Sequence, residues 1–143
     1  MSQENVEIVM AMFSPEDADL IREFADDEAW AARAESLARY YHEDFECRTS
    51  RFGGASYKGI EGLRAAWLEW LAPWASYRTE RHDPVDLGDT VFVPSYNFGR
   101  LHGSAEEIRL DGAAVFTLRD GKVARVEFYA DRTEALTAVG LAE

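Results

Sequence analysis

The sequence predicts an α+β fold, in which helices cover the concave face of a curved antiparallel sheet and enclose a mostly apolar pocket. Helical periodicity dominates the first half of the chain and strand alternation the second, an order typical of α+β domains. The 143 residues, of which 47% are hydrophobic, suit a single packed domain over residues 1–143. The connections between the later segments are too short for parallel crossovers, which favours antiparallel pairing.

Four helices are expected in the first half of the chain. They cover residues 5–13, a short segment from Pro15 to Phe24, residues 28–41 and residues 59–72. Ser14 is a good N-cap and Pro15 suits a first helical position, so this pair ends one helix and starts the next. Asp26 and Asp27 precede the third helix as caps, and Pro73 limits the fourth.

Strands are expected at residues 45–49, 77–87, 90–102, 106–119 and 122–130. Residues 50–58 contain Gly53-Gly54 and are typical of a covering loop. Asp120-Gly121 between two alternating segments is a strong hairpin signal. Pro94 cannot donate to a sheet ladder, which indicates a sheet edge or a bulge. A last helix over 131–139 ends at Gly140.

The charge balance restricts the partners of the protein. The chain carries 27 acidic and 15 basic residues, a net charge of −12, which disfavours nucleic acid and anionic membranes. Cys47 is the only cysteine, so no disulfide within the chain and no cysteine-rich metal site is expected. The first residues lack a signal-peptide pattern, and no apolar run approaches membrane-spanning length, which favours the cytoplasm. We expect no metal and no cofactor, because no nucleotide, P-loop or zinc motif is present.

Four segments in the same order resemble SnoaL-like proteins of the nuclear transport factor 2-like superfamily. These segments are residues 1–9 (MSQENVEIV), 57–64 (YKGIEGLR), 116–123 (FTLRDGKV) and 127–136 (EFYADRTEAL). The resemblance implies a cystatin/nuclear transport factor 2-like cone with N-terminal helices over the concave face of the sheet. It also implies a pocket between sheet and helices, and a homodimer formed through the outer face of the sheet. The same fold hosts many functions, so the resemblance is specific for the fold and weak for the activity.

The resemblance to polyketide cyclases of this family implies a general acid/base near the end of the last strand, and Asp131 occupies that position. Two further polar positions of catalytic relatives differ here. Ala114 stands where relatives have a histidine or a protonated aspartate, and Thr49 stands near the carboxylate base of ketosteroid isomerases. A standard isomerase or cyclase mechanism therefore lacks two of its three polar groups in this chain.

Alternation along residues 122–130 puts Glu127, Tyr129 and Asp131 on one face of the last strand. If that face lines the pocket, Asp131 is the acid/base, Tyr129 an oxyanion or orienting donor, and Glu127 a second carboxylate. Two alternatives stay open. Asp131 has the spacing of an N-cap for the last helix, with Glu134 three residues on. Glu127 is also suited to an ion pair with an arginine.

The pocket lining is expected from two sources. The helix over 59–72 and the residues after it supply Trp67, Trp70, Leu71 and Trp74, although aromatic side chains at helical spacing also suit ordinary core packing. The strands supply Leu110, Ala114 and Phe116 as an apolar wall, with Tyr96 or Asn97 as a hydrogen-bonding group. The two faces of the 90–102 strand cannot be told apart by pattern.

These observations predict a small-molecule-binding protein with a small apolar ligand. If it is an enzyme, the expected chemistry is cofactor-free acid/base catalysis of the isomerase or cyclase type. The alternative is a non-catalytic ligand-binding or dimerisation module, which Ala114 favours because it offers no hydrogen bond to a developing enolate.

Overall fold

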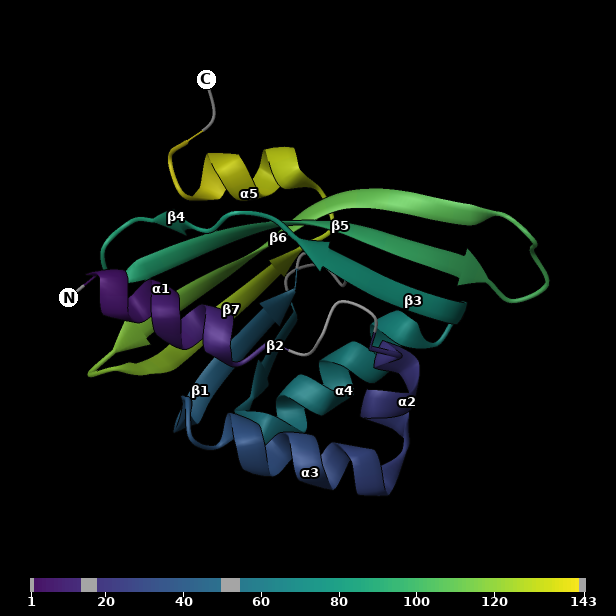
Figure 1. Ribbon diagram of the computed structural model, residues 1–143, viewed down its shortest axis with the longest axis horizontal. Helices are drawn as coiled ribbons and strands as arrows, with labels where there is room; N and C mark the ends of the chain where they lie inside the picture. The colour runs from purple at the N-terminus through teal and green to yellow at the C-terminus, as the bar shows by residue number, and fades with distance from the viewer. Residues whose placement is uncertain (1, 14–17, 50–54, 142–143) are drawn as a thin grey trace.

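The computed structural model describes residues 2–13, 18–49 and 55–141. Its elements are α1 (Ser2–Ala11), α2 (Leu20–Ala25), α3 (Asp27–Leu37), β1 (Tyr41–Thr49), β2 (Ala55–Lys58), α4 (Gly59–Leu71), β3 (Trp74–Arg81), β4 (Val85–Asp86), β5 (Thr90–Leu101), β6 (Glu107–Arg119), β7 (Lys122–Tyr129) and α5 (Arg132–Ala138). The predicted α+β cone with a curved sheet is confirmed (Figure 1). The expected helix start at Ser14 and Pro15 and the Gly53-Gly54 pair lie outside the described residues.

The strands form one sheet in the order β2-β1-β7-β6-β5-β3, with β4 beside β5. Each pair is antiparallel except β1 and β7, which run parallel. A purely antiparallel sheet was therefore the wrong expectation at this pair. Short connections exclude parallel pairing only between successive strands, whereas α4 and five strands, β2 to β6, lie between β1 and β7 along the chain.

Several element boundaries differ from the sequence prediction. The third helix ends at Leu37, and β1 begins already at Tyr41, because Tyr41 and Phe45 are buried as strand residues. Residues 55–58, expected in a loop, pair with β1 as β2. The long 77–87 segment divides into β3 and β4.

Pro94 lies inside the sheet, in β5, and not at an edge or a bulge. The amide of His82 donates to the carbonyl of Pro94 over 2.9 Å, at the position where β3 has just ended. The missing N–H of the proline therefore falls at the gap between β3 and β4, where the ladder is interrupted anyway.

The two faces of the sheet bury different clusters. The large core lies on the side of α2, α3 and α4, and its most buried large residues include Phe45, Phe116 and Val126. The smaller cluster on the opposite side joins α5 to the sheet through Phe92, Val115 and Ala135, among others. Figure 1 shows α5 on the face opposite α2, α3 and α4.

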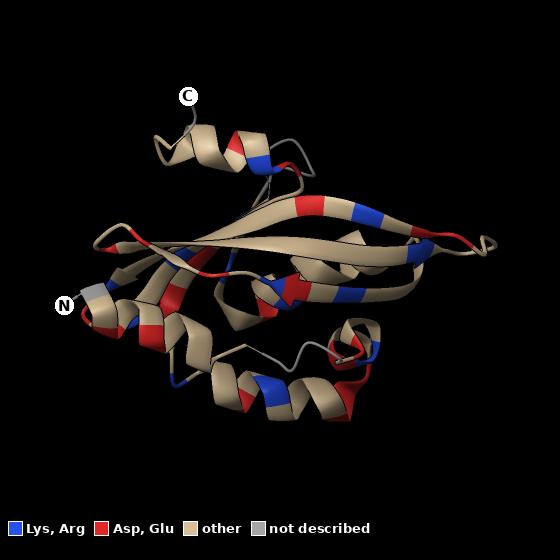
Figure 2. Ribbon diagram, turned by 45° about the horizontal axis from the view of Figure 1, so that its top comes forward, with Lys and Arg blue, Asp and Glu red and all other residues tan. Residues whose placement is uncertain are grey.

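The face that carries α5 is charged along its long strands. Arg109 pairs with Asp111 along β6, at 3.1 Å, and Arg78 pairs with Glu80 along β3, at 2.7 Å. Figure 2 shows the acidic and basic residues alternating along these strands. Such exposed pairs contribute little to stability, about 0–1 kcal/mol each, but keep this surface polar.

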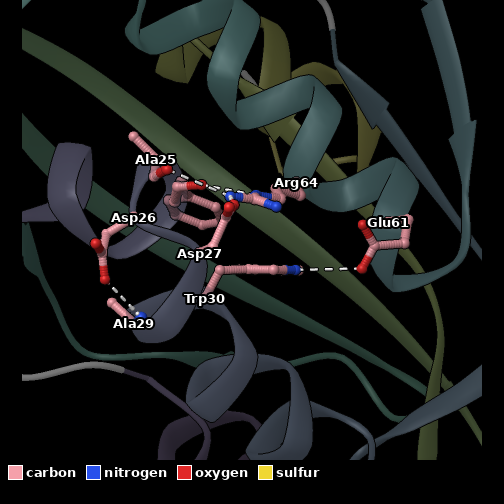
Figure 3. A network of polar contacts seen from close by, with 8 residues as sticks. Ala25, Asp26, Asp27, Ala29, Trp30, Glu61 and Arg64 are labelled. Atoms are coloured by element: carbon pink, nitrogen blue, oxygen red, sulfur yellow. Dashed lines mark hydrogen bonds and ion pairs between the residues drawn. The ribbon is translucent and has the colours of Figure 1, made fainter.

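A polar network around Arg64 joins α4 to the junction of α2 and α3 (Figure 3). The Arg64 Nε donates to the carbonyl oxygen of Phe24 at 2.8 Å, and its Nη2 lies 2.9 Å from the Asp27 carboxylate. The Trp30 indole donates to Glu61 at 3.2 Å, which ties α3 to the start of α4. The last carbonyls of a helix have no N–H partner within the helix. The Arg64 guanidinium donates to two of these carbonyls at the end of α2, those of Phe24 and Ala25, and so holds α4 against α2.

Candidate functional site

A cavity of about 100 Å³ lies between the helices and the inner face of the sheet. Helix residues such as Leu20, Phe24 and Leu63 line one side, and sheet residues such as Val93 and Phe128 line the other. The lining is mostly apolar. Its polar members therefore stand out as the groups that would orient a ligand.

The sheet side of the cavity carries a polar group of three residues. Asn97 and Ser95 alternate inward along β5 and are buried, with 5% and 8% of their surface exposed. Thr79, opposite Asn97 on β3, donates its hydroxyl to the Asn97 side-chain oxygen at 2.9 Å. The Asn97 amide nitrogen lies 3.5 Å from the Ser95 hydroxyl. These contacts fix the plane of the amide at the cavity wall.

The helix side carries an ion pair. The Arg33 Nε on α3 lies 2.9 Å from the Glu23 carboxylate on α2, and both side chains are largely buried. Arg33 also donates through its Nη2 to the carbonyl of Met12, just after α1. One side chain thus connects three segments around the cavity. Glu23 is the only carboxylate among the described residues that line it.

Aromatic rings form the walls beside these polar groups. Trp67 on α4 stacks on Phe24 at 5.1 Å and meets Phe128 edge-on at 5.3 Å, measured between ring centroids. Phe13 and Phe116 meet edge-on at 5.6 Å, and the Arg81 guanidinium lies 4.3 Å from the Phe13 centroid. Flat walls of this kind suit a planar ligand.

Tyr41 adds a phenol to the lining at the start of β1. Burial raises the pKa of its hydroxyl above the ordinary tyrosine value, and a small opposing effect comes from Arg33. The group is therefore neutral at physiological pH and is a hydrogen-bond donor, not an anion.

Of the three residues expected to be catalytic, only Tyr129 borders the cavity. Asp131 is exposed and is not among the described residues that line the cavity. Its carboxylate accepts from the Thr133 amide at 2.8 Å and caps α5. This geometry matches the capping alternative. A carboxylate that starts a helix on the outer side of the sheet does not point toward a cavity on the inner side.

Glu127 also belongs to the outer face of β7, because Val126 and Phe128 occupy the inner face. Its carboxylate lies 3.6 Å from Arg125 and accepts from the Tyr129 hydroxyl at 3.2 Å. Tyr129 borders the cavity, but it packs with the smaller cluster under α5. Burial, and then Glu127, raises the pKa of its phenol.

The expected pocket-lining residues divide into two groups. Trp67, Asn97, Ala114 and Phe116 line the cavity. The other five, which are Trp70, Leu71, Trp74, Tyr96 and Leu110, are not among the described lining residues and belong to other packing. The first three pack at the far end of α4, where Trp70 and Trp74 lie 5.9 Å apart.

Tyr96 points to the outer face, between the guanidinium groups of Arg109 and Arg132 at 4.9 and 4.8 Å. Side chains alternate along a strand, so an inward Asn97 requires an outward Tyr96. This settles which face of β5 looks inward. Leu110, paired with Asn97, lies on the inner face but beyond the cavity.

Sequence reasoning missed three charged lining residues, Glu23, Arg33 and Arg81. Glu23 and Arg33 occur on short amphipathic helices, where charged residues usually face water. Their pairing depends on the packing of α2 against α3. If the inward face of β5 had been known, the pairing of β3 with β5 would have indicated two more inward residues. These are Thr79, opposite Asn97, and Arg81, opposite Ser95.

Within the described ranges, no three histidine, cysteine, aspartate or glutamate residues are grouped to hold a metal ion. His42 instead contacts the Arg119 carbonyl oxygen, at 2.6 Å. No described helix combines the length and the apolar character that crossing a membrane requires.

A family model for the SnoaL-like domain matches residues 21–126, most of the chain. The chain belongs to the SnoaL-like family. The match includes α3, α4 and most of the sheet, and with them most of the residues that line the cavity. Among curated proteins, no sequence matches this one.

Solved structures show the same fold as this SnoaL-like chain. TerC, co-crystallised with polyporic acid, is 21% identical, with a TM-score of 0.65 and coverage of 96% of this chain and 98% of TerC. A hypothetical protein with a ketosteroid isomerase-like fold from Catenulispora acidiphila, in complex with trimethylamine, is 16% identical (TM-score 0.60; coverage 94% and 93%). A nuclear transport factor 2-like protein of unknown function from Burkholderia pseudomallei is 13% identical (TM-score 0.63; coverage 95% and 97%). At these identities, the similarity shows the fold alone.

Proposed function

We propose that this SnoaL-like protein binds a small, mainly apolar molecule in the cavity between its helices and its sheet. The observation that carries the proposal is the cavity itself, an apolar space with aromatic walls and a few converging polar groups. Its volume of about 100 Å³ is smaller than an engineered cavity of about 150 Å³ that binds benzene, which leaves no space for more than one ring. A one-ring ligand is therefore the proposed size class.

Native mass spectrometry of the purified protein tests for a carried ligand. A titration of the ¹⁵N-labelled protein with acetophenone then tests the cavity directly. Ala114→Leu extends a lining side chain into the space and should abolish binding, whereas Ala65→Leu on the exposed face of α4 should leave it unchanged. The proposal is overturned if no ligand is carried and acetophenone does not bind, or if Ala114→Leu binds it as the wild type does.

A second candidate function is cofactor-free acid/base catalysis, and Glu23 favours it. We assign this role to Glu23 and not to Asp131, because Glu23 faces the cavity and Asp131 caps α5. In such a step the Glu23 carboxylate takes a proton from the carbon next to a carbonyl, and the electron pair moves to the carbonyl oxygen as an enolate.

Deuterium incorporation into the methyl group of acetophenone in D₂O measures this step. Wild-type protein should accelerate it over buffer and Glu23→Gln should not, at equal ligand occupancy. If the wild type gives the buffer rate, the cavity binds without catalysing this exchange, and the non-catalytic alternative replaces the second candidate.

We further propose a homodimer through the outer face of the sheet, in the cytoplasm. Half-buried Tyr96 and Phe98 on that face, beside Arg109 and Arg78, support the interface. The single, buried Cys47 suits a reducing compartment. Sedimentation equilibrium tests the dimer, and a monomer at all concentrations would exclude it.

A further inference from the structure

Asn97 is the most buried side-chain amide at the cavity, with 5% of its surface exposed. It lies near the middle of β5, paired with Thr79 on β3 and with Leu110 on β6. Buried amides are normally fully hydrogen-bonded, and each exception calls for an explanation.

The hydrogen bonds of this amide with the described residues use only one of its two N–H groups. A primary amide has two N–H groups and one carbonyl oxygen. The described residues offer Asn97 two hydroxyl partners, Thr79 on the oxygen side and Ser95 on the nitrogen side. One N–H therefore has no partner among the residues that the structure describes. The same count holds if the amide is turned over, because each orientation presents one hydroxyl to the nitrogen.

The backbone beside Asn97 is shaped to leave room for its amide. Gly112 on β6 lies opposite Ser95, and a Cβ there would lie 3.0 Å from the Asn97 nitrogen and 2.5 Å from the Tyr129 carbonyl oxygen. A side chain at this position would displace the amide or the neighbouring strand. The glycine keeps Asn97 in place at the cavity wall.

The chemistry of the Asn97 N–H decides which ligand group it would bind. An amide N–H donates and does not accept, so the matching ligand group is an acceptor such as an oxygen. Arg33 and Glu23 at the cavity pair with each other at 2.9 Å, so this ion pair leaves no net charge beside the amide.

We propose that Asn97, supported by Ser95, binds the oxygen of a carbonyl or carboxylate group on a small planar ligand. This inference rests on the proposed ligand-binding function and names the chemical class of that ligand. The ring of the ligand lies against the aromatic wall of Trp67 and Phe128, and its oxygen accepts from the remaining Asn97 N–H. Asn97 is thus the residue that selects oxygen-bearing ligands over hydrocarbons of the same shape.

The test compares acetophenone with α-methylstyrene, which replaces the carbonyl oxygen by a CH₂ group at nearly the same shape. One neutral hydrogen bond is worth about 0.5–1.5 kcal/mol net, so acetophenone should bind about 2- to 12-fold more tightly. Asn97→Leu should remove this preference while α-methylstyrene still binds. Asn5→Leu, at the other asparagine of the chain, should keep it. Benzoate, measured in parallel, tells whether the carboxylate or the neutral carbonyl binds more tightly.

A wild-type measurement supports the test if Asn97→Leu fails to fold. The chain has only three side-chain amides, Gln3, Asn5 and Asn97, so their NH₂ signals in a ¹⁵N–¹H spectrum are readily assigned. Acetophenone should shift one Asn97 proton downfield, and α-methylstyrene should not. Equal affinity for the two probes overturns the inference but leaves the proposed function standing. A preference that survives Asn97→Leu also overturns it, whereas binding of neither probe contradicts the proposed function itself.

Discussion

Gly99 provides a test of how tightly the inner face of the sheet is packed. A Cβ at this position would lie 2.4 Å from Cε3 and 2.6 Å from Cζ3 of Trp74. Carbon atoms in ordinary contact lie about 3.5–4.0 Å apart, so Gly99→Ala requires the indole to retreat by about 1 Å. Trp70 and Tyr77 pack around that ring, with centroids 5.9 and 5.5 Å away, and leave it little freedom.

The expected cost follows from two opposing effects. Overpacking of a buried site costs about 1–3 kcal/mol. Alanine recovers about 0.5–1 kcal/mol, because glycine loses more conformational freedom than any other residue when a strand forms. The net loss is about 1–2 kcal/mol. The entropy of unfolding is about 2.1 cal/mol/K per residue, so over 143 residues each kcal/mol lowers Tm by about 3 °C. Gly99→Ala should therefore lower Tm by about 3–7 °C.

A double-mutant cycle with Trp74→Leu isolates the contact. Urea unfolding of the wild type, both single variants and the double variant gives the four free energies of unfolding. In the Trp74→Leu background the ring is gone, so Gly99→Ala should become neutral or slightly stabilising. If Gly99→Ala costs the same in both backgrounds, the ring contact is not its cause. If it stabilises the wild type, the packing argument is refuted.

Three further predictions concern the caps and the titrating groups. Asp131→Ala removes the cap of α5 and should lower the free energy of unfolding by about 0.5–2 kcal/mol, without changing acetophenone affinity in a titration. Arg64→Met leaves the Phe24 carbonyl without its donor and should cost about 1–3 kcal/mol in urea unfolding, whereas Arg39→Met on an exposed surface should cost almost nothing. The hydrogen bond to Glu69, then burial, raises the pKa of Tyr57 from 10.0 to about 12. The folded state therefore holds this proton more tightly, and the associated stability is complete below about pH 10 and lost toward pH 12. In Tyr57→Phe the free energy of unfolding should fall less between pH 10 and pH 12 than in the wild type. If it falls equally in both proteins, Tyr57 is not the source of the pH dependence.

Much of the fold could be predicted because local signals and burial agree. The turn at Asp120-Gly121, the cap at Asp131 and the glycine that ends α5 act within a few residues. The parallel pairing of β1 with β7 could not be read in this way, because it joins segments about 80 residues apart. The start of β1 could not be predicted either. The helical pattern of α3 continues into the first residues of β1, and tertiary packing overrides that pattern there.

The candidate site was harder to predict, because a one-residue change of phase moves a side chain to the other face of the sheet. Tyr96 and Asn97 are adjacent and both chemically suited to a pocket, yet only Asn97 lines the cavity. On β7 the alternation correctly placed Glu127 and Asp131 on the same side of the sheet. The error was to assign that side to the pocket, whereas it is the outer side that carries α5.

The positions of Asp131 and Glu23 relative to the sheet show how the cavity receives polar groups although residue 114 is an alanine. The carboxylates of Glu127 and Asp131, at the end of the last strand, lie on the outer face. There Glu127 pairs with Arg125, and Asp131 accepts from an amide of α5. The inner face instead receives its polar groups from β3 and β5, as the hydroxyls and amide around Asn97, and its carboxylate from α2. A ligand held at Asn97 would therefore meet acid/base chemistry from the helices and not from the end of the sheet. Glu23→Gln and Asp131→Asn separate these two arrangements. Only Glu23→Gln should change ligand binding or turnover, because only Glu23 lies at the cavity.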